Sequence, residues 1–146
     1  MKLGSDSDYL EIIELERVPL HLPRAGDIRV SVEIRIQDFC GKYQDVWLGK
    51  EHIEKFVASL SSLESSRKGS ACLSSLSLNE FKLEIRAMDA LGHMEVELSL
   101  QRFFYSSGSK SFGSRSRPVK LSGGFSIDPG QVSFLKAECE ALLQSL

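Results

Sequence analysis

The chain has 146 residues, a length that suits one domain built around a single core. Apolar residues make up 42% of it and charged residues 26%, a globular balance that excludes disordered chains and membrane-spanning ones. The net charge of −2 excludes a general electrostatic attraction to nucleic acid or to anionic lipid.

The first third of the chain contains three strand patterns. The strongest is a strict alternation in which Ile28, Val30, Val32, Ile34 and Ile36 are apolar and the residues between them are polar. A period of two with β-branched residues predicts a strand that has one buried face and one wet face. Weaker patterns predict further strands at Tyr9–Leu15 and Tyr43–Leu48.

A helical period follows these strands. The apolar residues Ile53, Phe56, Leu60 and Leu63 are spaced by three and four, as on one face of a helix. We therefore predict an amphipathic helix over residues 50–65.

The middle of the chain returns to alternation. Two runs, Phe81–Ala87 and Met94–Leu100, are joined by a short turn-forming segment and predict an antiparallel hairpin. A weaker strand is expected at Ala71–Leu78 before the hairpin, and another at Val119–Ile127 after it. The glycine pair Gly123-Gly124 interrupts the last of these and predicts a bulge or a close approach by another backbone.

The chain ends on a second helical pattern. Asp128 suits the capping position, Pro129 suits the first helical position, and Gln131 is placed to reach back as a capping-box partner. The apolar stripe of this helix is expected to comprise Val132, Leu135, Cys139, Leu142 and Leu146.

These elements predict a single α+β domain over residues 1–146. We expect a curved, mainly antiparallel sheet of six or seven strands with both amphipathic helices on one side, because the helices do not alternate with strands as βαβ units require. The amino-terminal residues show no basic end followed by an apolar run, so we expect a soluble cytoplasmic protein.

The segment between Tyr105 and Pro118 is the longest irregular stretch between strong elements, and it is rich in serine and glycine. Long connections without secondary structure are usually functional or disordered. Aromatic and basic residues in and around it form the predicted partner-binding set: Phe104, Tyr105, Lys110, Phe112, Arg115 and Arg117. The alternative interpretation is a solvated connector whose aromatic residues belong to the core at its root.

Catalytic and metal-binding patterns are missing from the sequence. His21, His52 and His93 lie in a proline-bounded loop, at a helix start and after a turn glycine, with no nucleophile or metal ligand at a diagnostic spacing. The three cysteines are odd in number and widely separated, so we expect buried free thiols rather than disulfides or a zinc site. The sequence therefore predicts no enzymatic activity, no metal and no cofactor.

The order of short motifs along the chain resembles a known family. Phe39-Cys40-Gly41 and Asp45-Val46-Trp47-Leu48 precede the first helix, Leu91-Gly92-His93-Met94 opens the second hairpin strand, and a Gly-Phe-Ser-Ile-Asp run at residues 124–128 leads into the terminal helix. This succession, over roughly residues 8 to 143, resembles the WapI-like immunity proteins of bacterial polymorphic toxin systems. The resemblance implies a cytoplasmic protein that binds a cognate toxin domain and blocks it without chemistry of its own, and it adds no site residues.

Two other functions and a homodimeric state stay open at this point. A curved antiparallel sheet with a glycine break would also suit a small-molecule or lipid-binding domain, which could be an enzyme. Nucleic-acid binding through the 105–118 segment is the weakest alternative, because the rest of the chain is acidic. An exposed strand edge would also allow two copies to pair as a homodimer.

Overall fold

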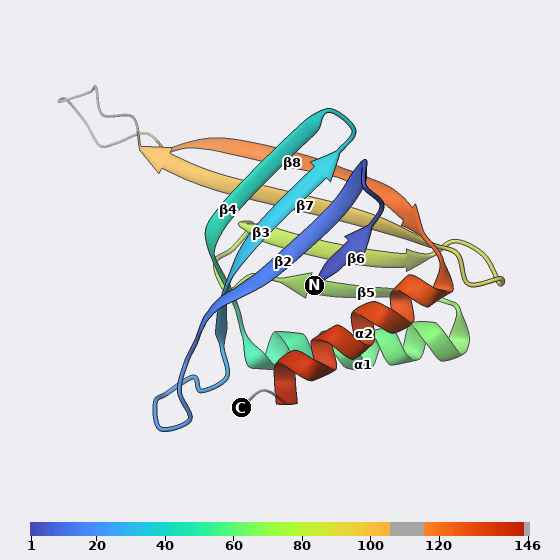
Figure 1. Cartoon of the computed structure of the whole chain (residues 1–146), viewed down its shortest axis with the longest axis horizontal. Coiled ribbons are helices and arrows are strands. Elements are labelled where there is room, and N and C mark those ends of the chain that lie inside the picture. The colour runs from blue at the N-terminus through green and yellow to red at the C-terminus, as the bar shows by residue number, and fades with distance from the viewer. Residues whose placement is uncertain (106–115, 145–146) are drawn as a thin grey trace.

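The computed structural model describes residues 1–105 and 116–144, with side chains described for residues 1–102 and 118–144 (Figure 1). In chain order the elements are β1 (Lys2–Gly4), β2 (Asp8–Arg17), β3 (Ile28–Ile36), β4 (Phe39–Leu48), α1 (Lys50–Ser66), β5 (Ser70–Ser74), β6 (Phe81–Ala87), β7 (Met94–Tyr105), β8 (Ser116–Ile127) and α2 (Pro129–Gln144). No helix among these residues is both long enough and apolar enough to cross a membrane.

The described strands form two antiparallel sheets. One has the order β1-β2-β3-β4 and the other the order β5-β6-β7-β8. Each sheet is a run of strands in chain order, and α1 carries the chain from the last strand of the first sheet to the first strand of the second. The two sheets cross each other face to face, and the two helices lie side by side at one end of them (Figure 1).

This arrangement confirms the α+β class and corrects the expected architecture. The prediction of one curved sheet with six or seven strands is wrong, because the described residues form two sheets of four strands. Alternation in a sequence identifies the apolar face of each strand but not the sheet that the strand joins. Here the two apolar faces bury each other, so one core serves both sheets.

The inner face of the first sheet follows the predicted alternation in β3. Ile28, Val30, Val32 and Ile34 have no exposed surface, and Ile36 is partly buried at the end of the strand. In β4 the pairing with β3 shifts register between Tyr43 and Val46. Because this bulge inserts a residue, Tyr43 and Val46 both face inward despite their odd separation.

Strand β8 crosses over the first sheet near its glycine pair. A side chain at Gly123 would place its Cβ 2.6 Å from Cδ1 of Ile36, and one at Gly124 would place it 2.3 Å from the backbone oxygen of Val96. The pairing of β7 with β8 runs without a register shift, so the expected bulge is absent and the expected close backbone approach is confirmed at Gly124.

Helix α1 begins without a side-chain cap of its own. Its N-cap residue is Gly49, and the cap is supplied from the start of β3, where Oδ1 of buried Asp27 accepts a 2.8 Å hydrogen bond from the backbone N–H of Lys50. The other oxygen of Asp27 accepts a 2.9 Å hydrogen bond from Nε of Arg24. One carboxylate therefore joins the β2–β3 loop to the helix start.

Helix α2 begins as predicted but uses one residue differently. Asp128 accepts a hydrogen bond from the backbone N–H of Gln131, which confirms its capping role. The capping-box role of Gln131 is wrong, because its side-chain oxygen accepts a 2.8 Å hydrogen bond from the backbone N–H of Gly4 in β1. In the apolar stripe, Val132, Leu135 and Cys139 are buried, Leu142 is partly buried, and Leu146 lies outside the described residues.

Candidate functional site

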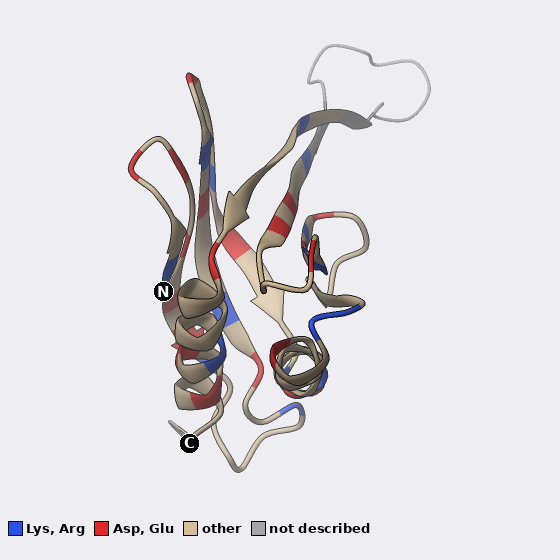
Figure 2. Ribbon diagram, turned by 90° about the vertical axis from the view of Figure 1, so that its right-hand side faces the viewer, with Lys and Arg blue, Asp and Glu red and all other residues tan. Residues whose placement is uncertain are grey.

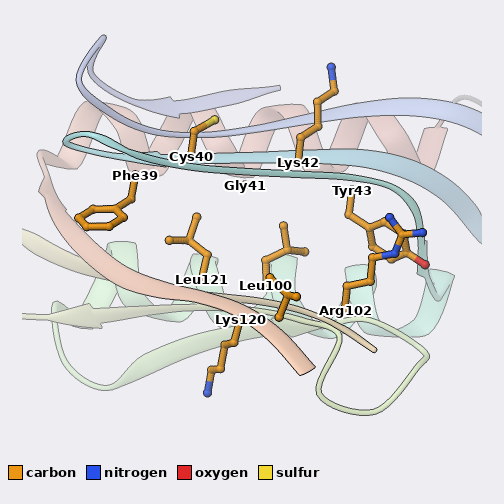
Figure 3. Close-up of a pocket in the computed structure, with 10 residues that line it drawn as sticks. Phe39, Cys40, Gly41, Lys42, Tyr43, Leu100, Arg102, Lys120 and Leu121 are labelled. Atoms are coloured by element: carbon orange, nitrogen blue, oxygen red, sulfur yellow. The ribbon is translucent and has the colours of Figure 1, made fainter. Parts of the chain in front are cut away.

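A slot opens between the two sheets at the end where the β3–β4 hairpin faces the β7–β8 hairpin (Figure 3). Its volume is about 510 Å³, within the range of ligand and anchor pockets. The side chains that shape its interior are those of Phe39, Tyr43, Leu100, Arg102, Val119 and Leu121, with the backbone of Gly41 forming part of one wall.

The slot is a direct product of strand register. On β7 and β8, Leu100 pairs with Leu121 and Arg102 pairs with Val119, so all four side chains face the first sheet. Opposite them, Gly41 lies between Phe39 and Tyr43 on the inward-facing positions of β4. An added Cβ at Gly41 would lie 3.0 Å from Cδ2 of Leu121 and 3.8 Å from Cδ2 of Leu100, so the two leucines form the floor beneath this glycine.

The rim of the slot is apolar and wet. Leu100 at the bottom is only 6% exposed, whereas Phe39 at one end is 69% exposed and Val119 at the edge is 60% exposed. The core of the sandwich therefore continues outward into surface that no described residue covers. Contiguous exposed apolar surface in a folded domain marks a binding site more often than a scattered apolar residue does.

The opposite end of the slot is polar. The guanidinium of Arg102 lies over the ring of Tyr43, with Cζ 4.8 Å from the ring centroid. Burial raises the pKa of the Tyr43 hydroxyl, and the carboxylates of Glu80 and Asp45 add to this rise while Arg102 opposes it. Burial also raises the pKa of Glu80, with a further contribution from the charge of Asp45.

The basic residues around the slot differ in direction. Arg102 lies inside it against Tyr43, whereas Lys42 and Lys120 extend away from it on the outer faces of β4 and β8 (Figure 3). Along the β7–β8 hairpin, the acidic positions lie at the end near the helices and the basic positions lie toward the opposite end (Figure 2). The end of the hairpin that carries the slot is therefore its basic end.

The partner-binding residues predicted from the sequence fall next to this slot or outside the described residues. Phe104, Tyr105 and Arg117 belong to β7 and β8, where Phe104 pairs with Arg117 two positions beyond the pair of Arg102 and Val119. Their side chains are not described, and Lys110, Phe112 and Arg115 lie outside the described residues. The binding role of all six stays a prediction.

The histidines do not meet one another. His21 is exposed in the β2–β3 loop, Nδ1 of His52 donates a hydrogen bond to the Ser74 carbonyl over 3.1 Å, and Nδ1 of His93 lies 2.8 Å from Oδ2 of Asp89. This contact is the main cause of the lowered pKa of Asp89. Across residues 1–105 and 116–144, no group of histidine, cysteine and carboxylate side chains is arranged to hold a metal ion.

The cysteines are free thiols, as expected, but only one is buried. Cys40 and Cys72 are exposed on the outer faces of their strands, so the prediction of burial is wrong for both. Cys139 is buried on the inner face of α2, and desolvation raises the pKa of its thiol to about 12. The difference arises because Cys40 and Cys72 occupy the wet positions of alternating strands.

The chain matches no family model, no curated protein sequence and no solved structure.

Proposed function

We propose that this protein is a non-enzymatic cytoplasmic binding protein that neutralises a cognate bacterial toxin domain, and that the slot end of the sandwich is its binding face. The observation that carries the proposal is the open slot itself, where Leu100 and Leu121 form an apolar floor flanked by the exposed side chains of Phe39 and Val119. The order of motifs that resembles the WapI-like immunity proteins supports the same function.

The composition of the slot suits recognition of a protein. Interface centres are enriched in aromatic residues and arginine, and their binding energy concentrates where such side chains sit in well-packed pockets. Here an aromatic residue, Phe39, and a stacked Arg102–Tyr43 pair lie at opposite ends of one apolar depression. Phe39 and Tyr43 lie on β4 and Arg102 lies on β7, so strand pairing orders the backbone that carries each of them before a partner binds.

Co-expression and pull-down with toxin domains encoded beside the gene would test this function. We expect one such domain to bind the purified chain and to lose its toxicity. Phe39→Asp is expected to abolish binding, because it places a charge on the apolar rim of the slot. The matched control is Leu91→Asp in the β6–β7 turn, where the leucine is 70% exposed, against 69% for Phe39, and lies outside the slot.

The proposal fails if none of the toxin domains encoded beside the gene binds the wild-type chain. It also fails if Phe39→Asp and Leu91→Asp bind the toxin domain equally well, since the slot would then have no role.

A second function is favoured by the size of the slot. A volume of about 510 Å³ with an apolar floor and one guanidinium would accommodate a small amphiphile. A thermal-shift titration with dodecanoate tests this directly. A rise in melting temperature that Leu121→Gln removes would support ligand binding, and an unchanged melting temperature would exclude this ligand class.

A further inference from the structure

We propose that the slot receives one apolar side chain of the protein partner and that Arg102 binds a carboxylate that the partner carries beside that side chain. This inference depends on the proposed function, and it specifies the chemistry of the partner: an acidic segment with a protruding aliphatic or aromatic residue.

The shape of the slot suits a single inserted side chain. Its floor is formed by Leu100 and Leu121, and Leu121 packs closely against the backbone of Gly41, where an added Cβ would lie 3.0 Å from Cδ2 of that leucine. Phe39 and Val119 lie at the rim with most of their surface exposed. A small ligand would leave these rim side chains in water, whereas a protein surface around the inserted side chain would cover them and exclude water from the contact.

Arg102 is held in place without its hydrogen-bonding capacity being used by the described residues. Cζ of Arg102 lies over the ring of Tyr43, 4.8 Å from its centroid, and a guanidinium carries five N–H donors in its plane. None of the ion pairs or side-chain hydrogen bonds among the described side chains includes Arg102. A pre-positioned guanidinium of this kind can bind a carboxylate through two parallel hydrogen bonds.

The surrounding charge favours an acidic partner. Residues 101–120 contain five basic residues and no acidic residue. Two of the five, Arg102 and Lys120, lie at the slot with Lys42; Arg102 lies inside it, and the two lysines point away from it (Figure 3). The carboxylates that oppose them, Glu80 and Asp45, act on Tyr43 at the polar end of the slot. A partner carboxylate is therefore expected on the side of Arg102 that faces Val119, away from these two groups.

The test is a calorimetric titration of the wild-type chain and its variants with the toxin domain encoded beside the gene. Val119→Asp is expected to weaken binding at least tenfold, because it puts a like charge against the acidic partner and removes apolar rim surface. Arg102→Gln is expected to weaken binding about tenfold and to reduce the dependence of binding on salt. The affinity of Arg102→Lys is expected to lie between those of the wild type and Arg102→Gln, because lysine keeps the charge but loses the planar fork.

Two controls keep the test interpretable. Leu91→Asp introduces the same charge at an exposed leucine outside the slot and is expected to bind like the wild type. Because Val119 and Arg102 lie at the surface, their variants are expected to melt within a few degrees of the wild type, and circular dichroism with thermal melts will check this.

The outcomes separate the inference from the function on which it depends. If the wild-type chain does not bind the toxin domain, the proposed function fails. If the wild-type chain binds and Val119→Asp, Arg102→Gln and Leu91→Asp all bind equally well, the function stands and the inference is overturned. Weakening by Val119→Asp with no effect of Arg102→Gln overturns the carboxylate contact, and displacement of the toxin domain by dodecanoate supports occupation of the slot by an apolar group.

Discussion

Removal of the Asp27 carboxylate tests how the first sheet is joined to helix α1. Asp27 is 8% exposed and makes two contacts, one with the backbone N–H of Lys50 and one with Nε of Arg24. Substitution by alanine removes the side-chain acceptor that Asp27 supplies to the helix start, since the N-cap residue is a glycine without a capping side chain. Loss of a helix cap costs roughly 1 kcal/mol, with a range of about 0.5–2.

The second contact contributes less. The Arg24 side chain is 65% exposed, so its ion pair with Asp27 is screened by water and is worth at most about 1 kcal/mol. We therefore expect Asp27→Ala to lower the free energy of unfolding by about 1–3 kcal/mol. Asp27→Asn keeps an acceptor for the Lys50 N–H and loses the ion pair, so its effect is expected to stay below about 1 kcal/mol and to match that of Arg24→Ala.

Urea unfolding monitored by circular dichroism measures these differences, with equal slopes required before the midpoints are compared. An Asp27→Ala variant as stable as the wild type would refute the capping role. Equal destabilisation by Asp27→Asn and Asp27→Ala would show that the charge, rather than the acceptor at the helix start, stabilises this junction.

Three further predictions follow from contacts in the two sheets and helices. Gly124→Ala is expected to lower the free energy of unfolding by about 2 kcal/mol or more. The alanine Cβ would meet the Val96 backbone oxygen at 2.3 Å, so one of the two strands must move. An unchanged midpoint of urea unfolding would contradict this prediction. In a thiol titration of the native protein at pH 8, the exposed thiols of Cys40 and Cys72 are expected to react quickly. Cys139 is expected to react only after unfolding, because it is buried and its pKa is about 12. Three fast thiols would refute the burial of Cys139. The pKa of Glu64 is lowered chiefly by a hydrogen bond from the Ser133 hydroxyl, so the stabilisation by the Glu64 carboxylate is present above its ordinary pKa and is lost as pH falls through the lowered pKa. Glu64→Gln is expected to flatten this part of the curve of unfolding free energy against pH by less than about 1 kcal/mol. A curve identical to that of the wild type would contradict the contact.

The sequence predicted well the elements that depend on local pattern. The alternation over residues 28–36 matches β3, the hairpin of β6 and β7 has the expected pairing, and α1 ends one residue beyond the predicted Ser65. Asp128 caps α2 as its position indicates. In each case the decisive interactions lie within a few residues or across one tight turn.

The features that the sequence did not predict depend on contacts between distant elements. Strand β1 has only three residues and exists because it pairs with β2, and Gln131 is diverted from its local capping role to Gly4 in that strand. The division into two sheets is set by where α1 turns the chain. The pattern of any single strand does not predict which of the two sheets that strand joins.

The slot was missed for the same reason. Its floor and walls come from β4, β7 and β8, and the only local signals were a glycine at position 41 within a strand and an apolar residue at position 39 beside a turn. The sequence directed attention to the 105–118 segment, which begins at the same end of the β7–β8 hairpin. The predicted residues differ from those that line the slot, and their binding role stays a prediction.

The most direct test of a binding face at the slot is hydrogen–deuterium exchange of the chain with and without the neighbouring toxin domain. Bound toxin domain is expected to slow exchange in Phe39–Tyr43 and in residues 119–121 and to leave exchange in the β6–β7 turn around Leu91 unchanged. Slowed exchange confined to the helices or to the β2–β3 loop, with the slot strands unaffected, would contradict it.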